Sequence, residues 1–179
     1  MGRGLMPDAV ARSAFSIDYA SLYEKGFRGI IFDIDNTLVL PDAPADERAI
    51  HLIGDLQEKG FSVVILSNNT GERVTSFAKA VGAVCVEKAL KPLPDGYRKA
   101  VALLGLPEEK IFAVGDQIYT DIWGANRAGI KAVLTEPFTL REEIQIVLKR
   151  LLEKPVKARC RKTGVPGIDR AEESGDTGS

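Results

Sequence analysis

The chain has 179 residues, of which 45% are hydrophobic and 27% are charged. Its 24 basic and 25 acidic residues leave a formal net charge of −1, so no global field favours nucleic acid as a partner. This size fits one globular domain, and no run approaches the ~20 apolar residues of a membrane-spanning helix. The two cysteines lie in unlike surroundings, so we expect no disulfide framework and a cytoplasmic location.

Short apolar runs alternate with longer segments of helical periodicity from Gly26 onward. This alternation predicts an α/β fold, a Rossmann-like doubly wound parallel sheet in a single domain. The expected strands are Gly29–Asp33, Ser62–Leu66, Ala83–Val86, Ile111–Gly115 and Lys131–Leu134. The expected helices are Ala45–Lys59, Glu72–Val81, Asp95–Leu104, Asp121–Ala128 and Leu140–Glu153.

The folded domain is expected to span residues 1–154. Residues 155–179 are expected to form a disordered tail, because they are rich in charge and have little to bury. The helix expected over 140–153 is followed by a cluster of basic residues. Packing on the sheet is the default interpretation of this helix, and a peripheral contact with anionic lipid is the alternative.

Polar residues follow the ends of the predicted strands. Asp33 and Asp35 end the first strand, Ser67 and Asn68 follow the second, and Asp116 follows the fourth. In an open α/β sheet, ligands bind beyond the carboxyl ends of the strands, where the strand order reverses. If the second and third strands lie on one side of the first, and the fourth and fifth on the other, Asp33 and Asp116 become neighbours.

These residue types point to phosphoryl transfer. Clustered carboxylates raise one another's pKa unless a cation neutralises them, and Mg²⁺ suits Asp33, Asp116 and a backbone carbonyl near Asp35. Ser67, the amides of its turn and Lys91 supply the donors and positive charge that phosphate requires. Asp33 is then the expected nucleophile, and Asp35 the group that moves protons to the leaving group and from water.

Four ordered motifs resemble those of the haloacid dehalogenase superfamily of phosphatases, namely Asp33-x-Asp35-x-Thr37, Ser67, Lys91 and Gly115-Asp116-x-x-x-x-Asp121. Their wording is similar to subclass IIIA, the branch with the YqeG-type proteins and the phosphatidylglycerophosphate phosphatases. The resemblance implies Mg²⁺ as cofactor and a phosphoaspartate intermediate. It implies that Asp33 and Asp35 are the catalytic residues and that Ser67, Asn68 and Lys91 bind the phosphate of the substrate. It further implies that Asp33, Asp35 and Asp116 bind the metal, with Thr37 and Asp121 in supporting roles.

The connections in which this superfamily often carries a cap domain are short in this chain. Neither Leu38 to Ala45 nor Val86 to Asp95 has room for a cap, so an open site is expected. An open site suits a large or membrane-resident substrate, and phosphatidylglycerophosphate is the leading candidate by resemblance. A phosphoprotein, a nucleotide or another small phosphomonoester is the alternative.

Each motif also has a simpler interpretation. Asp33 and Asp35 can cap a turn, Ser67 can begin one, and Lys91 can be a surface lysine. Asp121 is favourable in the first turn of a helix whatever its function. The rival from another class is a non-catalytic module that binds a phosphorylated ligand or a protein, although such a module has no need for Asp35.

Overall fold

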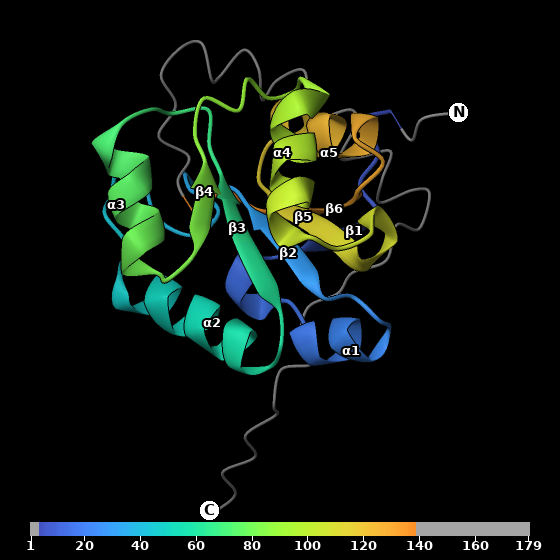
Figure 1. Ribbon diagram of the computed structural model, residues 1–179, viewed down its shortest axis with the longest axis horizontal. Helices are drawn as coiled ribbons and strands as arrows, with labels where there is room; N and C mark the ends of the chain where they lie inside the picture. Colours follow the sequence, from blue (N-terminus) through green and yellow to red (C-terminus); the bar gives the residue numbers. More distant parts are fainter. Residues whose placement is uncertain (1–3, 139–179) are drawn as a thin grey trace, which may run out of the picture.

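The computed structural model describes residues 4–138 (Figure 1). Its six strands form one parallel sheet in the order β1-β6-β5-β2-β3-β4. The predicted fold class and the assumed placement of the strands are therefore confirmed. The strands are β1 (Ala9–Ala11), β2 (Gly29–Phe32), β3 (Ser62–Leu66), β4 (Val84–Val86), β5 (Ile111–Gly115) and β6 (Lys131–Thr135).

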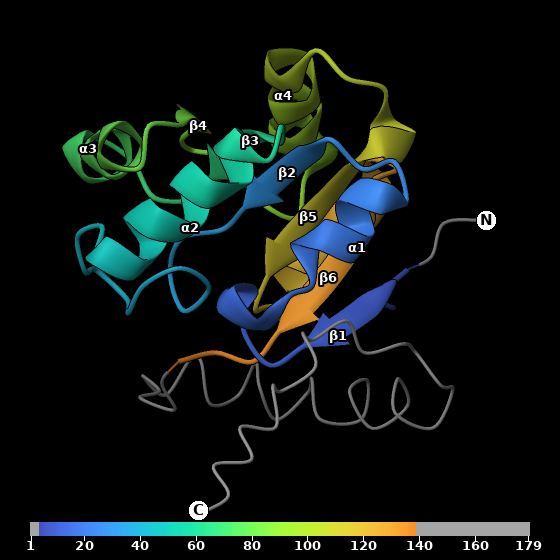
Figure 2. The same cartoon turned by 90° about the horizontal axis from the view of Figure 1, so that it is seen from below.

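Helices cover both faces of the sheet (Figures 1 and 2). One hydrophobic cluster joins α1, α2 and α3 to the first face, and a second joins α4 and α5 to the other. The helices are α1 (Tyr19–Glu24), α2 (Glu47–Glu58), α3 (Glu72–Ala80), α4 (Pro94–Leu104) and α5 (Trp123–Arg127), with short turns at Ala14–Ser16, Glu108–Lys110 and Ile118–Ile122.

The central strands are buried on both faces. In β2, Ile30 and Phe32 belong to the first cluster and Ile31 to the second, and β3 and β5 alternate in the same way. Side chains of a strand point alternately to its two faces, so a strand covered on both sides must be apolar throughout. This is why the strands appeared in the sequence as unbroken apolar runs.

Two short elements near the N-terminus were not predicted. Strand β1 has three residues and pairs with β6 at the edge of the sheet, and α1 has six residues. The helix begins where the Asp18 carboxylate accepts a hydrogen bond from Ser21 N, 3.0 Å away. Tyr19 anchors it by burying its ring and donating from its hydroxyl to Ala14 O at 2.7 Å. Neither element is long enough to show a periodicity.

One predicted helix is wrong at its start. The segment expected as a helix from Asp121 instead begins with a π-helical turn, Ile118–Ile122, which leads into α5. The helix expected over 140–153, the tail 155–179 and the domain end at 154 lie outside the described residues. Within residues 4–138, no helix has the length and apolarity needed to cross a bilayer.

The chain reverses direction across the sheet between β2 and β5. It runs outward from β2 through β3 and β4 and then returns to form β5 and β6 on the other side. The two reversal strands are directly paired, and Asp33 N donates to Val114 O at 3.0 Å. The loops that follow β2 and β5 therefore begin side by side, at the point where open α/β sheets bind ligands.

Substitution of two leucines tests how much the hydrophobic core contributes to the free energy of unfolding. Leu56 of α2 is 2% exposed and belongs to the first cluster, whereas Leu103 of α4 is 54% exposed. Leu56→Ala should lower the free energy of unfolding by about 2–5 kcal/mol, because it leaves a cavity. Leu103→Ala should change it by about 0.5 kcal/mol or less. Urea denaturation measures both, and equal effects would contradict the assigned packing.

Candidate active site

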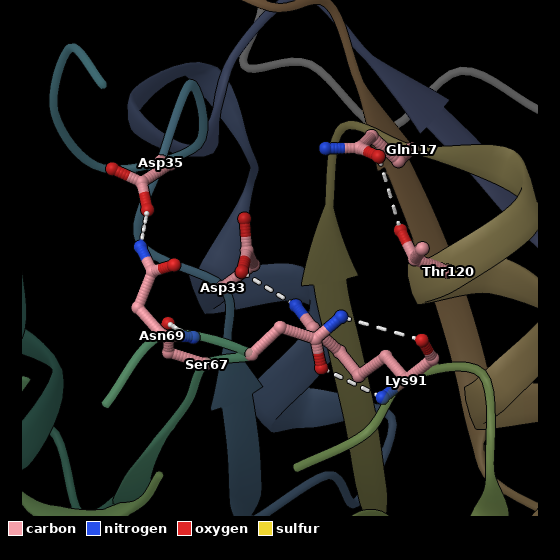
Figure 3. Close-up of a pocket in the computed structure, with 8 residues that line it drawn as sticks. Asp33, Asp35, Ser67, Asn69, Lys91, Gln117 and Thr120 are labelled. Atoms are coloured by element: carbon pink, nitrogen blue, oxygen red, sulfur yellow. Dashed lines mark hydrogen bonds and ion pairs between the residues drawn. The ribbon is translucent and has the colours of Figure 1, made fainter. Parts of the chain in front are cut away.

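A pocket of about 280 Å³ opens at the carboxyl ends of β2, β3 and β5. In Figure 3, Asp35 and Asn69 lie on one side of Asp33, and Gln117 and Thr120 on the other. Five of the eight lining residues have a site role predicted from the sequence. The full lining is Asp33, Asp35, Ser67, Asn68, Asn69, Lys91, Gln117 and Thr120.

A buried lysine joins two of the acidic motifs. Lys91 Nζ donates to Asp33 Oδ1 at 2.5 Å and to Asp121 Oδ1 at 2.7 Å, and its side chain is 4% exposed. Removing one partner of such a buried pair costs about 3–5 kcal/mol, because the other charge is left uncompensated. The interpretation of Lys91 as an ordinary surface lysine is therefore wrong.

Three buried carboxylates meet beside this lysine. Asp33, Asp116 and Asp121 each offer a carboxylate oxygen, and these oxygens lie within 4.8 Å of one another. Hard oxygen ligands at this spacing suit a divalent cation such as Mg²⁺. Asp121 thus lies in the acidic cluster itself, whereas the carboxylate of Asp35 points elsewhere.

Burial and neighbouring charges shift the pKa values of Asp33 and Lys91 in this cluster. The pKa of Asp33 is raised to about 7, and burial is the largest cause. Lys91 opposes this rise in pKa, and Asp121 and Asp35 reinforce it. Burial lowers the pKa of Lys91, but Asp121 and Asp33 outweigh burial and hold this pKa well above its ordinary value. A divalent cation beside Asp33 would therefore displace a proton and favour the carboxylate form.

The loop after β5 fixes Asp121 from several directions. Its Oδ2 accepts a hydrogen bond from Gln117 N at 3.0 Å, and its backbone carbonyl accepts one from the hydroxyl of Tyr97 at 3.0 Å. A Cβ on Gly115 would lie 2.5 Å from Cβ and Cγ of Asp121. Glycine at this position therefore allows the carboxylate of Asp121 to approach the end of β5.

The turn after β3 supplies Ser67 and Asn68. Ser67 is 1% exposed, and its Oγ accepts a hydrogen bond from Asn69 N at 3.1 Å. The side chain of Asn68 binds the backbone of Lys91 twice, since its Oδ1 accepts from Lys91 N at 2.7 Å and its Nδ2 donates to Lys91 O at 3.3 Å. Asn68 therefore places the lysine, and its direct contact with phosphate stays a prediction.

The carboxylate of Asp35 is held by Arg73, which was not predicted from the sequence, and by Asn69, which follows Ser67 and Asn68 in the turn after β3. Arg73 Nη2 donates to Asp35 Oδ1 at 2.6 Å, and Asn69 Nδ2 donates to Asp35 Oδ2 at 2.9 Å. Arg73 lies in the first turn of α3, four residues after Asn69. Nothing in its sequence position marks it, because its partner is 38 residues away in the chain.

Thr37 lies in the tight turn that follows Asp35. Its backbone N donates to Ile34 O at 3.2 Å, and the residue is 1% exposed. Among the described residues, no hydrogen-bond partner faces its Oγ1. Asn36 in the same turn has a φ of 62°, a left-handed conformation that asparagine tolerates better than most residues. The supporting role of Thr37 stays a prediction.

Comparison with known proteins identifies the family of the chain. The family model for haloacid dehalogenase-like hydrolase matches residues 40–129, which include Ser67, Lys91, Asp116 and Asp121. The chain is also 33% identical to the probable phosphatase YqeG of Bacillus subtilis (strain 168), over 89% of this chain and 93% of that protein. The chain belongs to the haloacid dehalogenase-like hydrolase family. The predicted YqeG-type resemblance and the predicted enzyme class, a phosphatase of the haloacid dehalogenase type, are confirmed.

A second relative carries a substrate in its name. The chain is 31% identical to phosphatidylglycerophosphate phosphatase 1, chloroplastic, of Chlamydomonas reinhardtii, over 89% of this chain. The chain spans 64% of the length of that relative.

A solved structure agrees on the fold. An uncharacterized protein from Listeria monocytogenes serotype 4b matches with a TM-score of 0.52 at 19% identity, covering 76% of this chain and 99% of that one. At this sequence identity, the match supports only the fold of this haloacid dehalogenase-like chain.

Two glycine substitutions test the close packing behind Asp121. Gly115→Ala should displace Asp121 from Lys91 and lower phosphatase activity by roughly a hundredfold, since a shift of about 1 Å can cost that much. Overpacking should also lower the free energy of unfolding by about 1–3 kcal/mol. Gly54→Ala, in α2, meets nothing within 4 Å and should leave activity unchanged. Retention of full activity in Gly115→Ala would contradict the assigned role of the contact.

Proposed function

We propose that the chain is a magnesium-dependent phosphomonoester hydrolase that works through a phosphoaspartate on Asp33. The observation that carries the proposal is the placement of Asp33 in the pocket, in contact with the buried ammonium group of Lys91 and with a carboxylate oxygen within 4.8 Å of those of Asp116 and Asp121. An aspartate that only caps a turn would not require a buried lysine and two further buried carboxylates beside it. Phosphoryl transfer requires a nucleophile surrounded by positive charge and donors.

In the proposed first step, an oxygen of Asp33 attacks phosphorus while the bond from phosphorus to the leaving oxygen breaks. The bonding electron pair goes to the leaving oxygen, which takes a proton from Asp35 and departs as an alcohol. Asp33 now carries the phosphoryl group. Lys91 remains positioned to balance the negative charge that develops on the phosphoryl oxygens.

In the proposed second step, water attacks the phosphorus of the phosphoaspartate. Asp35, now a carboxylate, takes the proton from water, and the bond from phosphorus to Asp33 breaks. Inorganic phosphate leaves, and both aspartates return to their starting states. The use of two differently placed carboxylates explains why Asp33 contacts Lys91 while Asp35 lies apart from the acidic cluster.

The carboxylates fit a bound magnesium ion. Asp33 and Asp116 are the proposed side-chain ligands, with the backbone carbonyl of Asp35 as predicted from the family resemblance. Asp121 is close enough to support this set. When bound, magnesium supplies positive charge to the phosphoryl oxygens and keeps Asp33 ionised. Ser67 and the amides of its turn are the proposed donors to the remaining phosphoryl oxygens.

The chemistry is tested by removing the nucleophile. Asp33→Asn should abolish release of phosphate from p-nitrophenyl phosphate, lowering kcat by at least about a thousandfold, because a carboxamide cannot form the covalent intermediate. EDTA should abolish wild-type activity, and added magnesium should restore it. Asp55→Asn, on the exposed face of α2, is the matched control and should behave as the wild type. Undiminished turnover by Asp33→Asn would refute the mechanism.

We further propose that the substrate is a lipid phosphate, with phosphatidylglycerophosphate as the leading candidate. The name of the Chlamydomonas relative supports this choice. The pocket mouth supports it too, because within residues 4–138 the connections 33–46 and 87–93 hold no inserted domain that would cover it. The predicted cytoplasmic location at a membrane surface stays a prediction, as does a contact of residues 140–153 with lipid.

A substrate panel separates the proposed lipid from the alternatives. Phosphatidylglycerophosphate in mixed micelles should give a kcat/KM about a hundredfold or more above those of nucleotides, sugar phosphates and phosphopeptides. A hydrophobic anchor held outside the pocket contributes binding energy that small esters lack. Preference for a phosphopeptide or a nucleotide would replace the proposed substrate and leave the mechanism standing. Absence of turnover on the whole panel would favour the non-catalytic binding module.

A further inference from the structure

The proton-transferring carboxylate of Asp35 has a cation of its own, separate from Lys91. Both terminal nitrogens of Arg73 reach it, Nη2 to Oδ1 at 2.6 Å and Nη1 to Oδ2 at 3.3 Å. A guanidinium that meets both oxygens of a carboxylate fixes its orientation as well as its position, which a lysine cannot do. The two carboxylates of the first motif therefore pair with different cationic side chains, Asp33 with Lys91 and Asp35 with Arg73.

Two further donors complete the contacts of Asp35. Asn69 Nδ2 donates to Oδ2 at 2.9 Å, and the backbone N of Asp42 donates to Oδ1 at 3.1 Å. Oδ1 is the more firmly anchored oxygen, because its contact with Arg73 is the shorter of the two. Oδ2 faces Asn69, another residue of the pocket lining (Figure 3).

Arg73 is itself held in place by the loop it serves. Its Nη2 also donates to the backbone carbonyl of Ala43 at 3.3 Å, and its Nε lies 4.0 Å from Oδ1 of Asp42. The side chains of Arg73 and Asp35 are 24% and 25% exposed, so the pair lies at the rim of the pocket. Helix α3 is thereby tied to the loop that follows β2.

We propose that Arg73 is a positioning residue for proton transfer: it holds the carboxyl group of Asp35 by Oδ1 at the pocket mouth, so that Oδ2, which carries the proton, meets the leaving-group oxygen. The inference rests on the proposed phosphatase mechanism. General acid catalysis requires a distance of about 2.6–3.2 Å between the heavy atoms, and an unrestrained aspartate on an exposed loop seldom holds that geometry. The contact between Arg73 and Asp35 is an ion pair while Asp35 is a carboxylate. When Oδ2 carries the proton, Oδ1 still accepts the hydrogen bond from Arg73 Nη2, so the restraint persists in both states.

A merely structural ion pair and a positioning pair differ in their dependence on the leaving group. The p-nitrophenolate ion leaves readily without a proton, whereas phenolate is a poorer leaving group and gains more from protonation. Arg73→Met should therefore lower kcat for phenyl phosphate by about tenfold or more and for p-nitrophenyl phosphate by about threefold or less. Arg73→Lys, which keeps the charge but loses the two-point contact, should fall between Arg73→Met and the wild type.

A double-substitution cycle shows whether Arg73 acts through Asp35. In an Asp35→Asn background, Arg73→Met should lower the remaining phenyl phosphate activity by about twofold or less. The matched control is Arg98→Met, which removes an exposed arginine paired with Asp95 at 2.9 Å and should leave both substrates unaffected. Thermal unfolding and circular dichroism establish that each variant is folded.

The outcomes separate the two proposals. Equal losses on the two aryl phosphates, or a full additional loss in the Asp35→Asn background, would overturn the positioning role while the phosphatase mechanism stood. Absence of magnesium-dependent turnover in the wild type would overturn both. If Arg73→Met does not fold, Arg73→Lys, which loses the two-point contact, must show the selective loss on phenyl phosphate to a smaller degree, and an unselective loss then refutes the proposal.

Discussion

The buried ammonium group of Lys91 is the interaction on which the site depends. It joins Asp33 at the end of β2 to Asp121 in the loop after β5, and it arrives from the loop after β4. Three separate connections therefore meet at one charge. Burial penalises the charged forms of Asp33 and Lys91, and their contact offsets part of that cost for both. The site and the packing of the loops around it are a single arrangement.

The backbone conformation of the loop after β4 places the ammonium group of Lys91 in the site. Lys88 and Leu90 have φ values of 49° and 52°, left-handed conformations that cost side-chain-bearing residues about 1–2 kcal/mol each. Asn68 then holds the backbone of Lys91 by two hydrogen bonds. Neighbouring packing must overcome this cost, and the close approach of Gly96 to the carbonyl oxygen of Ala89 shows how tightly α4 fits behind the loop.

Much of this architecture is predictable from the sequence, for definite physical reasons. The four longer strands, β2, β3, β5 and β6, are largely buried on both faces, so each appears as an apolar run, and β3 and β5 match their predicted bounds. Motif residues that follow such strands must meet at one edge of a parallel sheet, which is why Asp33 and Asp116 were placed together. The short β1 and α1 lack a pattern, because edge pairing and the Tyr19 contacts specify them instead.

Side-chain contacts between different loops could not be predicted from the sequence. The sequence placed Asp121 in a supporting role, but only the π-helical turn and the absence of a side chain at Gly115 show that its carboxylate enters the acidic cluster. Likewise, Arg73 lies far from Asp35 in the chain, and no spacing rule connects an arginine at the start of one helix to a turn on another strand. Such contacts follow from the relative placement of α3 and the loop after β2.

The covalent intermediate on Asp33 is the claim that a measurement can test most directly. The enzyme is mixed with substrate and magnesium, quenched rapidly in acid, and treated with borohydride, which reduces an acyl phosphate to an alcohol. Peptide mass spectrometry then locates the reduced residue. The account predicts a homoserine in place of Asp33 only in samples that received both substrate and magnesium. Turnover without modification at Asp33, or modification at a different carboxylate, would contradict it.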